Sequence, residues 1–312
     1  MMNIVIVGQG AMGLLWHNHM QTFSANVASI SLLPSPKQSQ QAANNKTVTI
    51  EYSYTHLNGL SEQCNYQLAQ ISQLNNADVI LVCVKSYQVK QVLADISDKL
   101  NKHAIIILAH NGMGTLHDIA HAILDQHTIL ALLTTHGCAR PMPKHIIHTG
   151  LGQSDLGILS GRLSANITNT LTELFNKALP PVHWQENIIA KQWQKLAVNC
   201  VINPLTALYN IDNGEINSAV FSDLKVMLIT ELVQVAKAEN FDFIATDLLN
   251  LVNQVATTTA RNCSSMRTDI LAKRTTEIDY INGYIHRLGL KHHISTPQNS
   301  QLLQQIKMLG QD

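Results

Sequence analysis

The sequence predicts an α/β protein in which a Rossmann-type, doubly wound sheet domain is followed by an all-helical C-terminal domain. This prediction rests on three observations. An apolar, β-branched run at residues 4–7 leads into a glycine-rich turn and then into a helix-compatible segment. Apolar runs recur through the first part of the chain, separated by helical or loop segments, as a parallel sheet covered by helices requires. From about residue 186 these runs disappear and long helical patterns replace them.

The first strand is followed by a loop whose glycines suit a bound dinucleotide. A pyrophosphate binds to backbone N–H groups at a helix N-terminus, where no side chain blocks its approach. Gly8 permits the tight turn, Gly10 lets the backbone approach the phosphates, and Gly13 lets the helix pack on the strand. The alternative is a glycine-rich turn without a ligand. The predicted cofactor contacts in this loop are Gly8, Gln9, Gly10, Ala11, Met12 and Gly13.

The remaining strands of the sheet follow in order. A second strand is expected over residues 26–33, and the runs at 78–84 and 104–109, which are apolar apart from Asp78, predict two more. Because these runs are apolar on both faces, they fit a parallel sheet between layers of helices. Three later runs are expected to complete the same sheet, the later ones as antiparallel strands: residues 128–135, 145–149 and 154–159.

Polar residues follow two of these strands. Ligands of doubly wound sheets bind outside the carboxyl ends of the strands, so Lys85 and Asn111 are candidate cofactor contacts. Lys85 can neutralise part of the cofactor's charge, and Asn111 offers both a donor and an acceptor beside the nicotinamide. The alternatives are a solvated strand end for Lys85 and a turn-forming role for Asn111.

The second domain is predicted to be helical and to bind a small substrate. The pair Pro180-Pro181 marks the approach to the boundary, and we place the domains at residues 1–185 and 186–312. A helical domain beside a dinucleotide domain also suggests a substrate cleft between the two. The helices are expected at residues 188–201, 218–239, 245–260, 270–288 and 300–309.

Three polar side chains share one face of the first of these helices. Lys195, Asn199 and Asn203 are spaced by four residues, so they lie on one side of an otherwise apolar helix. An ammonium and two carboxamides suit a ligand that bears a carbonyl and a carboxylate. The alternative is a half-exposed polar face of a packed helix. Pro204 is expected to end the helix, with Asn203 in its last turn.

The composition excludes several classes of function. Lys plus Arg and Asp plus Glu both number 21, so the formal charge is zero with neutral histidines. Without an excess of cations to displace counterions, nucleic acid is not an expected partner. No apolar run approaches the ~20 residues that cross a bilayer. Since the first strand also leaves no room for a secretory leader, we expect a cytoplasmic protein without a membrane partner. Five widely spaced cysteines favour reduced thiols.

The fifteen histidines raise the question of a metal site. His117 and His121 have i, i+4 spacing, but the intervening residues do not form a His-Glu-x-x-His arrangement and no third ligand lies nearby in the sequence. A solvated helix face is the better interpretation, and no metal is predicted.

Taken together, the motifs resemble those of the ketopantoate reductase (2-dehydropantoate 2-reductase) family, and they span nearly the whole chain. The resemblance implies NADPH-dependent reduction of the ketone of 2-dehydropantoate to (R)-pantoate, a step toward pantothenate and coenzyme A. The matching segments are the glycine loop, Lys85-x-x-Gln88, residues 110–114, residues 195–207, Asn213-Gly214-Glu215, Ser264-Ser265-Met266 and residues 277–283.

The resemblance also implies roles for individual residues. Lys195 would donate a proton to the carbonyl oxygen as hydride arrives from nicotinamide C4, and Glu277, the second catalytic residue, would lie by the nicotinamide ribose and the substrate hydroxyl. Asn111 would lie where cofactor and substrate meet. Ser265 has an alternative explanation, because Ser264-Ser265 also suits a helix N-cap. The implied substrate contacts are Asn111, Lys195, Asn199, Asn203, Asn213 and Ser265. The implied cofactor contacts beyond the glycine loop are Lys85, Gln88, Asn111, Cys138 and Glu277, although Cys138 is also explained as a space-filling residue.

One region departs from the family pattern. NAD enzymes place an acid at the end of the second strand for the ribose 2′-hydroxyl, whereas a nearby Arg accommodates the 2′-phosphate of NADP. Residues 29–37 contain neither, and an apolar residue replaces the family's usual Arg. The absence of the acid favours NADP, with Ser31, Ser35 or Lys37 as candidate phosphate contacts.

Two other functions remain open from the residues alone. A related NAD(P)-dependent 2-keto or 3-hydroxy acid dehydrogenase would differ only in its small-molecule substrate. A non-catalytic NADP-binding sensor would bind cofactor without turnover, but it has no need for Lys195 beside Asn199 and Asn203. The sequence leaves both a monomer and a homodimer open.

Overall fold

The computed structural model describes residues 2–23, 28–35, 38 and 48–310. The chain divides into two compact units. Unit 1 comprises residues 1–110 and 118–188, and unit 2 comprises residues 111–117 and 189–312. The short segment 111–117, which follows a strand of unit 1, therefore belongs to the helical unit.

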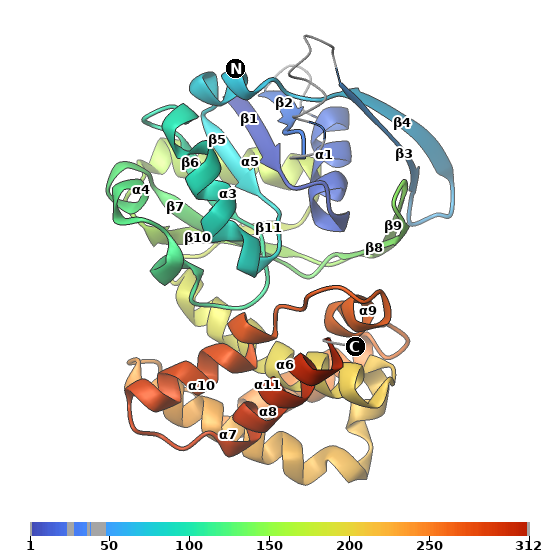
Figure 1. Cartoon of the computed structure of the whole chain (residues 1–312), viewed down its shortest axis with the longest axis vertical. Helices are drawn as coiled ribbons and strands as arrows, with labels where there is room; N and C mark the ends of the chain where they lie inside the picture. Colours follow the sequence, from blue (N-terminus) through green and yellow to red (C-terminus); the bar gives the residue numbers. More distant parts are fainter. Residues whose placement is uncertain (1, 24–27, 36–37, 39–47, 311–312) are drawn as a thin grey trace. The chain divides into compact units, whose positions relative to one another are not determined.

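Unit 1 is built on a sheet of seven strands in the order β11-β10-β7-β6-β5-β1-β2 (Figure 1). The five strands from β7 to β2 are parallel, β10 is antiparallel to β7, and β11 is parallel to β10. This arrangement confirms the predicted α/β class and the antiparallel direction of β10. The strands are β1 (Met2–Val7), β2 (Ala28–Leu32), β5 (Val79–Val82), β6 (Ile105–Leu108), β7 (Ile129–Thr134), β10 (Ser154–Ser160) and β11 (Val182–Trp184).

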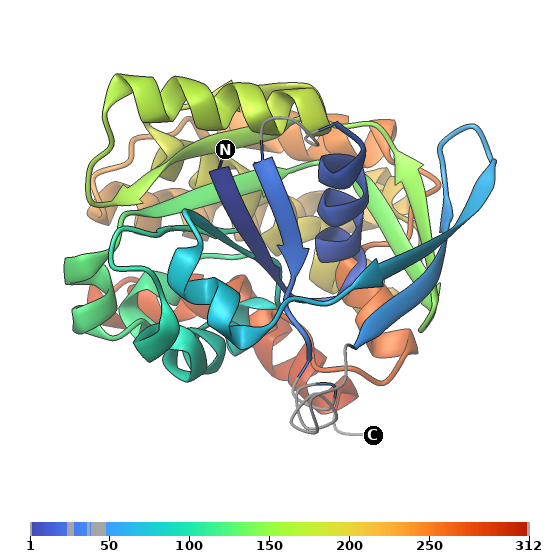
Figure 2. The same ribbon diagram turned by 90° about the horizontal axis from the view of Figure 1, so that it is seen from above.

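Helices cover both faces of this sheet, and Figure 2 shows α5 and α3 on opposite sides of it. The rings of Trp16 in α1 and Phe175 in α5 pack 5.3 Å apart, over a core that includes Ile4 and Ile6. Burial on both faces explains why the central strands are apolar throughout. The helices are α1 (Ala11–Phe23), α3 (Val89–Ile96), α4 (His121–Gln126) and α5 (Ala165–Ala178), with short 3-10 helices η1 (Ile71–Asn76), η2 (Ser86–Gln88), η3 (Ser97–Lys99) and η4 (Thr115–Asp118).

A second sheet of four strands, in the order β4-β3-β9-β8, also belongs to unit 1. The prediction that residues 145–149 complete the main sheet is wrong, because β9 pairs with β3 and β8 instead. Burial alternates along β9, with Ile146 and His148 inside, as in a sheet that is covered on one face only. The strands are β3 (Thr49–Thr55), β4 (Ser61–Gln67), β8 (Gly137–Met142) and β9 (His145–Gly150).

Unit 2 is helical, as predicted. Its core centres on α6, where the Trp193 ring packs 6.0 Å from the rings of both Tyr284 and Phe241. Among residues 2–23, 28–35, 38 and 48–310, no helix has the length and apolarity that spanning a membrane requires. The helices are α6 (Ile188–Tyr209), α7 (Ser222–Ala238), α8 (Ala245–Thr258), α9 (Ser265–Leu271), α10 (Asn282–Lys291) and α11 (Pro297–Leu309), with η5 (Asn213–Asn217), η6 (Ala219–Phe221) and η7 (Ile278–Tyr280).

Two expectations about these helices are wrong. The continuous helix expected over residues 270–288 is broken into α9, an irregular connection and α10, because Lys273 adopts φ 52° and closes α9. The helix α6 also continues through Pro204 to Tyr209 instead of ending there. Since proline has no N–H, the carbonyl of Cys200 loses its helical partner, and Asn282 Nδ2 donates to that carbonyl at 3.0 Å instead.

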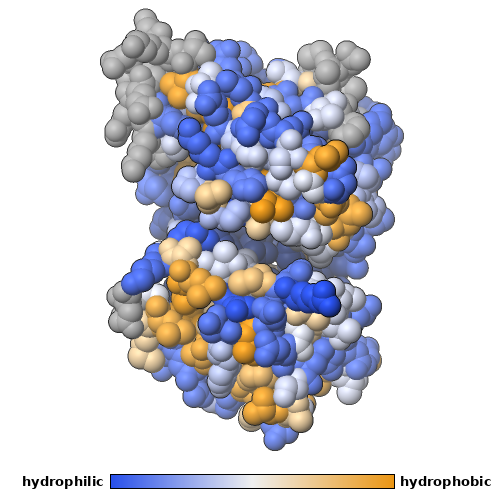
Figure 3. Space-filling view, turned by 90° about the vertical axis from the view of Figure 1, so that its right-hand side faces the viewer, coloured by the Kyte–Doolittle hydropathy of each residue, from blue (hydrophilic) through white to orange (hydrophobic). Residues whose placement is uncertain are grey.

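The surface is mixed in character. Large hydrophobic side chains are exposed on both units, among them Leu151 in unit 1 and Val220 in unit 2. On the face drawn in Figure 3, orange hydrophobic patches interrupt a largely hydrophilic surface. Exposed apolar side chains are ordinary on a protein surface.

Candidate active site

The glycine loop between β1 and α1 has the geometry that a dinucleotide site requires. Gly8 adopts φ +114°, and a Cβ at this position would lie 2.9 Å from the carbonyl carbon of Cys83. A Cβ at Gly13 would lie 1.9 Å from the carbonyl oxygen of Gly8. These two glycines are therefore required by the turn itself. At Gly10, by contrast, no described atom lies within 4 Å of where a Cβ would stand, so this side of the loop is open to a ligand.

The strand β8 brings two further side chains to this loop. The thiol of Cys138 donates to the carbonyl of Ala11 at 3.4 Å, and burial raises the pKa of Cys138 to about 12. This cysteine is therefore a neutral thiol at the start of α1. Arg140, which the sequence analysis did not select, donates from Nη1 to the carbonyl of Gln9 at 2.7 Å. No motif indicated this contact, because the two residues lie 131 positions apart.

The motif Lys85-x-x-Gln88 closes a turn at the carboxyl end of β5. The Lys85 N–H donates to Gln88 Oε1 at 3.2 Å, and the Gln88 N–H donates to the Lys85 carbonyl at 2.9 Å. The Cys83 N–H, two residues earlier, donates to the carbonyl of Val7 at 2.7 Å, and Val7 directly precedes the glycine loop. Lys85 and Gln88 thus occupy the end of the strand that neighbours β1, where ligands of such sheets bind.

In unit 2, Lys195, Asn199 and Asn203 lie along one face of α6, at the predicted spacing. Lys195 and Asn199 are half-buried, and Asn203 is 7% exposed. The Asn199 Nδ2 atom is buried and makes no hydrogen bond to any residue that the structure describes. A buried amide donor without an acceptor costs about 1–3 kcal/mol. A hydrogen bond from this amide to an acceptor on a ligand would remove the cost. The Asn199 amide therefore marks this face of α6 as a candidate binding surface.

The structure brings Asn111 and Glu277 together. Asn111 Nδ2 donates to Glu277 Oε2 at 3.4 Å, and Glu277 is only 4% exposed. The segment that carries Asn111 is held by its backbone, because the Met113 N–H donates to the Tyr280 carbonyl at 2.8 Å. Gly112 is necessary for this approach, since a Cβ there would lie 2.3 Å from the same carbonyl oxygen.

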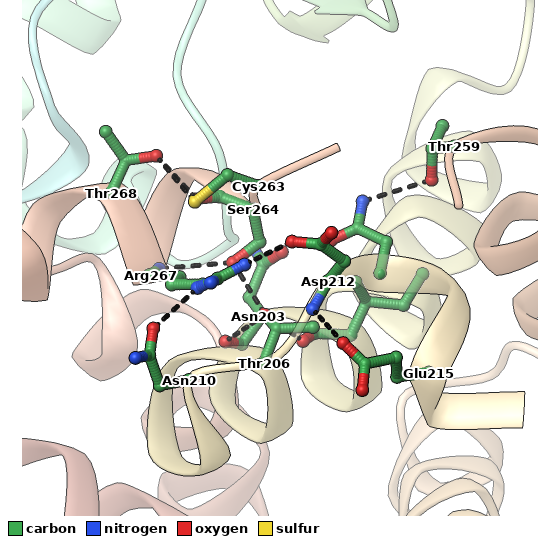
Figure 4. Close-up of polar contacts among 12 residues, drawn as sticks. Asn203, Thr206, Asn210, Asp212, Glu215, Thr259, Cys263, Ser264, Arg267 and Thr268 are labelled. Atoms are coloured by element: carbon green, nitrogen blue, oxygen red, sulfur yellow. Dashed lines mark hydrogen bonds and ion pairs between the residues drawn. The ribbon is translucent and has the colours of Figure 1, made fainter. Parts of the chain in front are cut away.

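The start of α9 is fixed to α6. The Ser264 hydroxyl accepts from the Arg267 N–H at 3.1 Å and so caps α9. It also hydrogen-bonds to the Thr206 hydroxyl at 2.7 Å, which in turn lies 3.1 Å from the Asn203 carbonyl (Figure 4). Ser264 is therefore the N-cap, whereas the predicted substrate contact Ser265 follows it and is exposed.

An ion pair holds the turn that carries Asn213. Arg267, whose side chain is 16% exposed, donates from Nη1 to Asp212 Oδ1 at 2.5 Å and from Nε to Asn210 Oδ1 at 2.9 Å (Figure 4). Asn213 Nδ2 donates to Thr259 at 3.0 Å, but its buried Oδ1 has no partner in the part of the chain that the structure describes. No local motif indicates a role for Arg267, because its ion-pair partner lies 55 residues away.

The residues of unit 2 can therefore present an ammonium, a buried amide donor, a buried amide acceptor and a carboxylate. An ammonium beside fixed amide dipoles stabilises negative charge that develops on a ligand oxygen. Within residues 2–23, 28–35, 38 and 48–310, no group of three or more His, Cys, Asp or Glu side chains is arranged to hold a metal ion.

The doubly wound sheet, its glycine loop and the lysine-bearing face of α6 define the class of dinucleotide-dependent oxidoreductases. Family models agree: ketopantoate reductase PanE/ApbA matches residues 4–161, and ketopantoate reductase PanE/ApbA C terminal matches residues 187–310. The chain therefore belongs to the ketopantoate reductase family.

Individual relatives match over nearly their whole length. The 2-dehydropantoate 2-reductase of Vibrio cholerae is 36% identical over 312 residues, which cover 99% of this chain and 98% of the relative. That of Yersinia pestis is 35% identical over 311 residues, covering 100% and 96%.

Solved structures share the fold. A PanE/ApbA family ketopantoate reductase from Ralstonia eutropha aligns with a TM-score of 0.83 and 23% identity, over 99% of each chain. D-mandelate dehydrogenase with NADH and anilino(oxo)acetate aligns with a TM-score of 0.86 and 20% identity, also over 99% of each chain.

Proposed function

We propose that this chain reduces the ketone of 2-dehydropantoate to the alcohol of (R)-pantoate with NADPH, in the synthesis of pantothenate and coenzyme A. Beyond family membership, the polar face of α6 is the observation that supports this function. It presents Lys195, Asn199 and Asn203 together, and the Asn199 amide donor is buried without a partner among the described residues. A 2-keto acid offers the missing acceptors, since it carries a ketone oxygen and a carboxylate.

Lys195 is the proposed proton donor. Negative charge develops on the ketone oxygen during reduction, and an ammonium both stabilises this charge and supplies the proton. We propose that Asn199 and Asn203 hold the substrate against Lys195. Asn213 and Ser265 are proposed as further contacts, because Asn213 offers a buried acceptor and Ser265 is exposed at the start of α9.

Glu277 and Asn111 are proposed to orient the reacting groups. Glu277 accepts a hydrogen bond from Asn111, and this contact fixes the direction of the Asn111 amide. A buried carboxylate at this position can also accept a hydrogen bond from the substrate hydroxyl or from the nicotinamide ribose.

Residues 1–185 are proposed as the NADP-binding domain and residues 186–312 as the substrate-binding domain. The glycine loop, Lys85, Gln88 and Cys138 would hold the cofactor, with Asn111 and Glu277. The open side of Gly10 fits this assignment, because a phosphate can approach the backbone there. When bound, NADPH supplies the hydride that reduces the ketone carbon.

The preference for NADPH over NADH rests on the end of β2, where the sequence provides no acid for a ribose 2′-hydroxyl. Of the three candidate phosphate contacts, Ser31 is half-buried in β2. Ser35 donates to Gln38 Oε1 from its N–H at 2.8 Å and from its hydroxyl at 2.9 Å. Lys37 lies outside the described residues.

The test is an NADPH oxidation assay with 2-dehydropantoate and a panel of other 2-keto acids. We expect the highest kcat/KM for 2-dehydropantoate, because we propose that the polar face of unit 2 binds this substrate. A higher value for another keto acid would identify a different dehydrogenase. Cofactor binding without turnover of any substrate would identify a sensor and contradict the proposal.

A further inference from the structure

The end of β2 lies directly against the glycine loop. Gln9 Nε2 donates to the carbonyl of Leu33 at 3.1 Å and to Gln38 Oε1 at 2.7 Å. Residue 9 therefore joins the loop to the position where the 2′-substituent of an adenosine ribose is recognised in dinucleotide-binding sheets. Residues 28–35 carry neither an acid nor a cation at this position.

A positively charged side chain of β8 contacts residue 9. Arg140, in β8, donates from Nη1 to the carbonyl of Gln9 at 2.7 Å. Its Nε donates to the carbonyl of Pro143 at 3.0 Å, and its Nη2 donates to the same oxygen. Arg140 is half-buried, and the turn between β8 and β9 holds its guanidinium in a fixed direction.

We propose that Arg140 supplies the positive charge that recognises the 2′-phosphate of NADP(H), in place of the arginine that is absent from the end of β2. This inference rests on the proposed function, because it concerns the same cofactor. The pyrophosphate of a dinucleotide needs no cation from β8, since backbone N–H groups at the start of α1 serve it. A 2′-phosphate carries additional negative charge, and a guanidinium is the side chain best suited to it.

The position of Arg140 also explains how its charge is kept in place. The carbonyl oxygens of Gln9 and Pro143 accept hydrogen bonds from the guanidinium and carry no formal charge of their own. Lys144, in the same turn of the β8–β9 hairpin, is exposed and provides a matched control of equal charge.

The experiment measures binding rather than turnover. Dissociation constants for NADPH, NADH, adenosine 2′,5′-bisphosphate and AMP are determined by calorimetry for the full chain and for Arg140→Gln, Arg140→Lys and Lys144→Gln. We expect Arg140→Gln to weaken binding of NADPH and of the bisphosphate by about 10-fold to 100-fold. NADH and AMP should change by less than about twofold, and Lys144→Gln should resemble the parent chain.

Arg140→Lys keeps the charge but not the planar fork, so its NADPH affinity should lie between those of the parent chain and Arg140→Gln. Equal losses for NADPH and NADH would assign Arg140 to the support of the glycine loop and overturn the inference. Unchanged NADPH affinity in both Arg140 variants would also overturn it. If the parent chain itself bound neither NADPH nor NADH, the proposed function would fail first, so the two failures are distinguishable.

Discussion

The side-chain amide of Asn282 donates a hydrogen bond to the carbonyl of Cys200, at 3.0 Å. This carbonyl would accept from residue 204 in an unbroken helix, but residue 204 is proline. Asn282, at the first position of α10, therefore replaces the missing donor and is itself fully buried. The contact explains how α6 continues past Pro204, so that Asn203 is followed by further helical residues and does not lie in the last turn.

Replacement of this donor should destabilise unit 2. We expect Asn282→Ala to lower the free energy of unfolding by about 1–3 kcal/mol, because it leaves a buried carbonyl without a partner. Denaturant unfolding of the full chain measures the change. In the Asn282→Ala background, Pro204→Ala should recover about 1 kcal/mol, because it restores the helical N–H. If Pro204→Ala were equally effective with Asn282 present, the two residues would be uncoupled and the explanation would fail.

The hydrogen bond between Asn282 and Cys200 also shows what the sequence can and cannot predict. The glycine loop and the spacing of Lys195, Asn199 and Asn203 are local patterns, and the structure has the expected turn and helix at both. The continuation of α6 past Pro204 depends on a donor 82 residues away from Cys200. No local pattern contains that information.

The second sheet illustrates a different limit. Asn58-Gly59, with Gly59 at φ +83°, is a hairpin signal between β3 and β4, and Tyr52 and Tyr54 alternate with less buried residues. These local signals were available in the sequence. The pairing of β9 with β3, however, joins residues about ninety positions apart, so hydrophobic pattern alone assigned β9 to the wrong sheet.

Arg267 is expected to act on the substrate through Asn213. Arg267→Met removes the ion pair with Asp212 and loosens the turn that holds Asn213. We predict that KM for the keto acid rises about tenfold while kcat changes by less than about threefold. Steady-state kinetics at saturating NADPH measure both. Arg261→Met, at an exposed position nearby in the chain, is the control and should leave both constants unchanged. A lower melting temperature with an unchanged KM would show that the ion pair is only structural.

Histidines of unit 1 whose pKa values are lowered should make stability sensitive to acid. Burial, together with the nearby His148, lowers the pKa of His19 and of His136 to about 4. A histidine in the unfolded chain titrates near pH 6.5. Below that pH the unfolded state binds protons that the folded state excludes, so stability is complete above pH 6.5 and is lost as the pH falls toward 4.

Urea unfolding at several pH values between 7 and 4 measures this dependence. His136→Gln should reduce the loss of stability across this range, because one of the histidines whose pKa is lowered no longer titrates. His183→Gln, which changes an exposed histidine on β11, should leave the pH dependence as it is. An identical pH dependence in His136→Gln and the parent chain would contradict the assignment.

The central claim is that Lys195 donates the proton to the substrate oxygen. The most direct measurement compares kcat for Lys195→Ala and the parent chain at saturating NADPH and 2-dehydropantoate, together with the dissociation constant for NADPH. We predict that kcat falls by about 100-fold to 10,000-fold, whereas NADPH affinity changes by less than about twofold. Lys237→Ala, an exposed lysine of α7, should retain full activity. A Lys195→Ala enzyme whose kcat matched that of the parent chain would contradict the account.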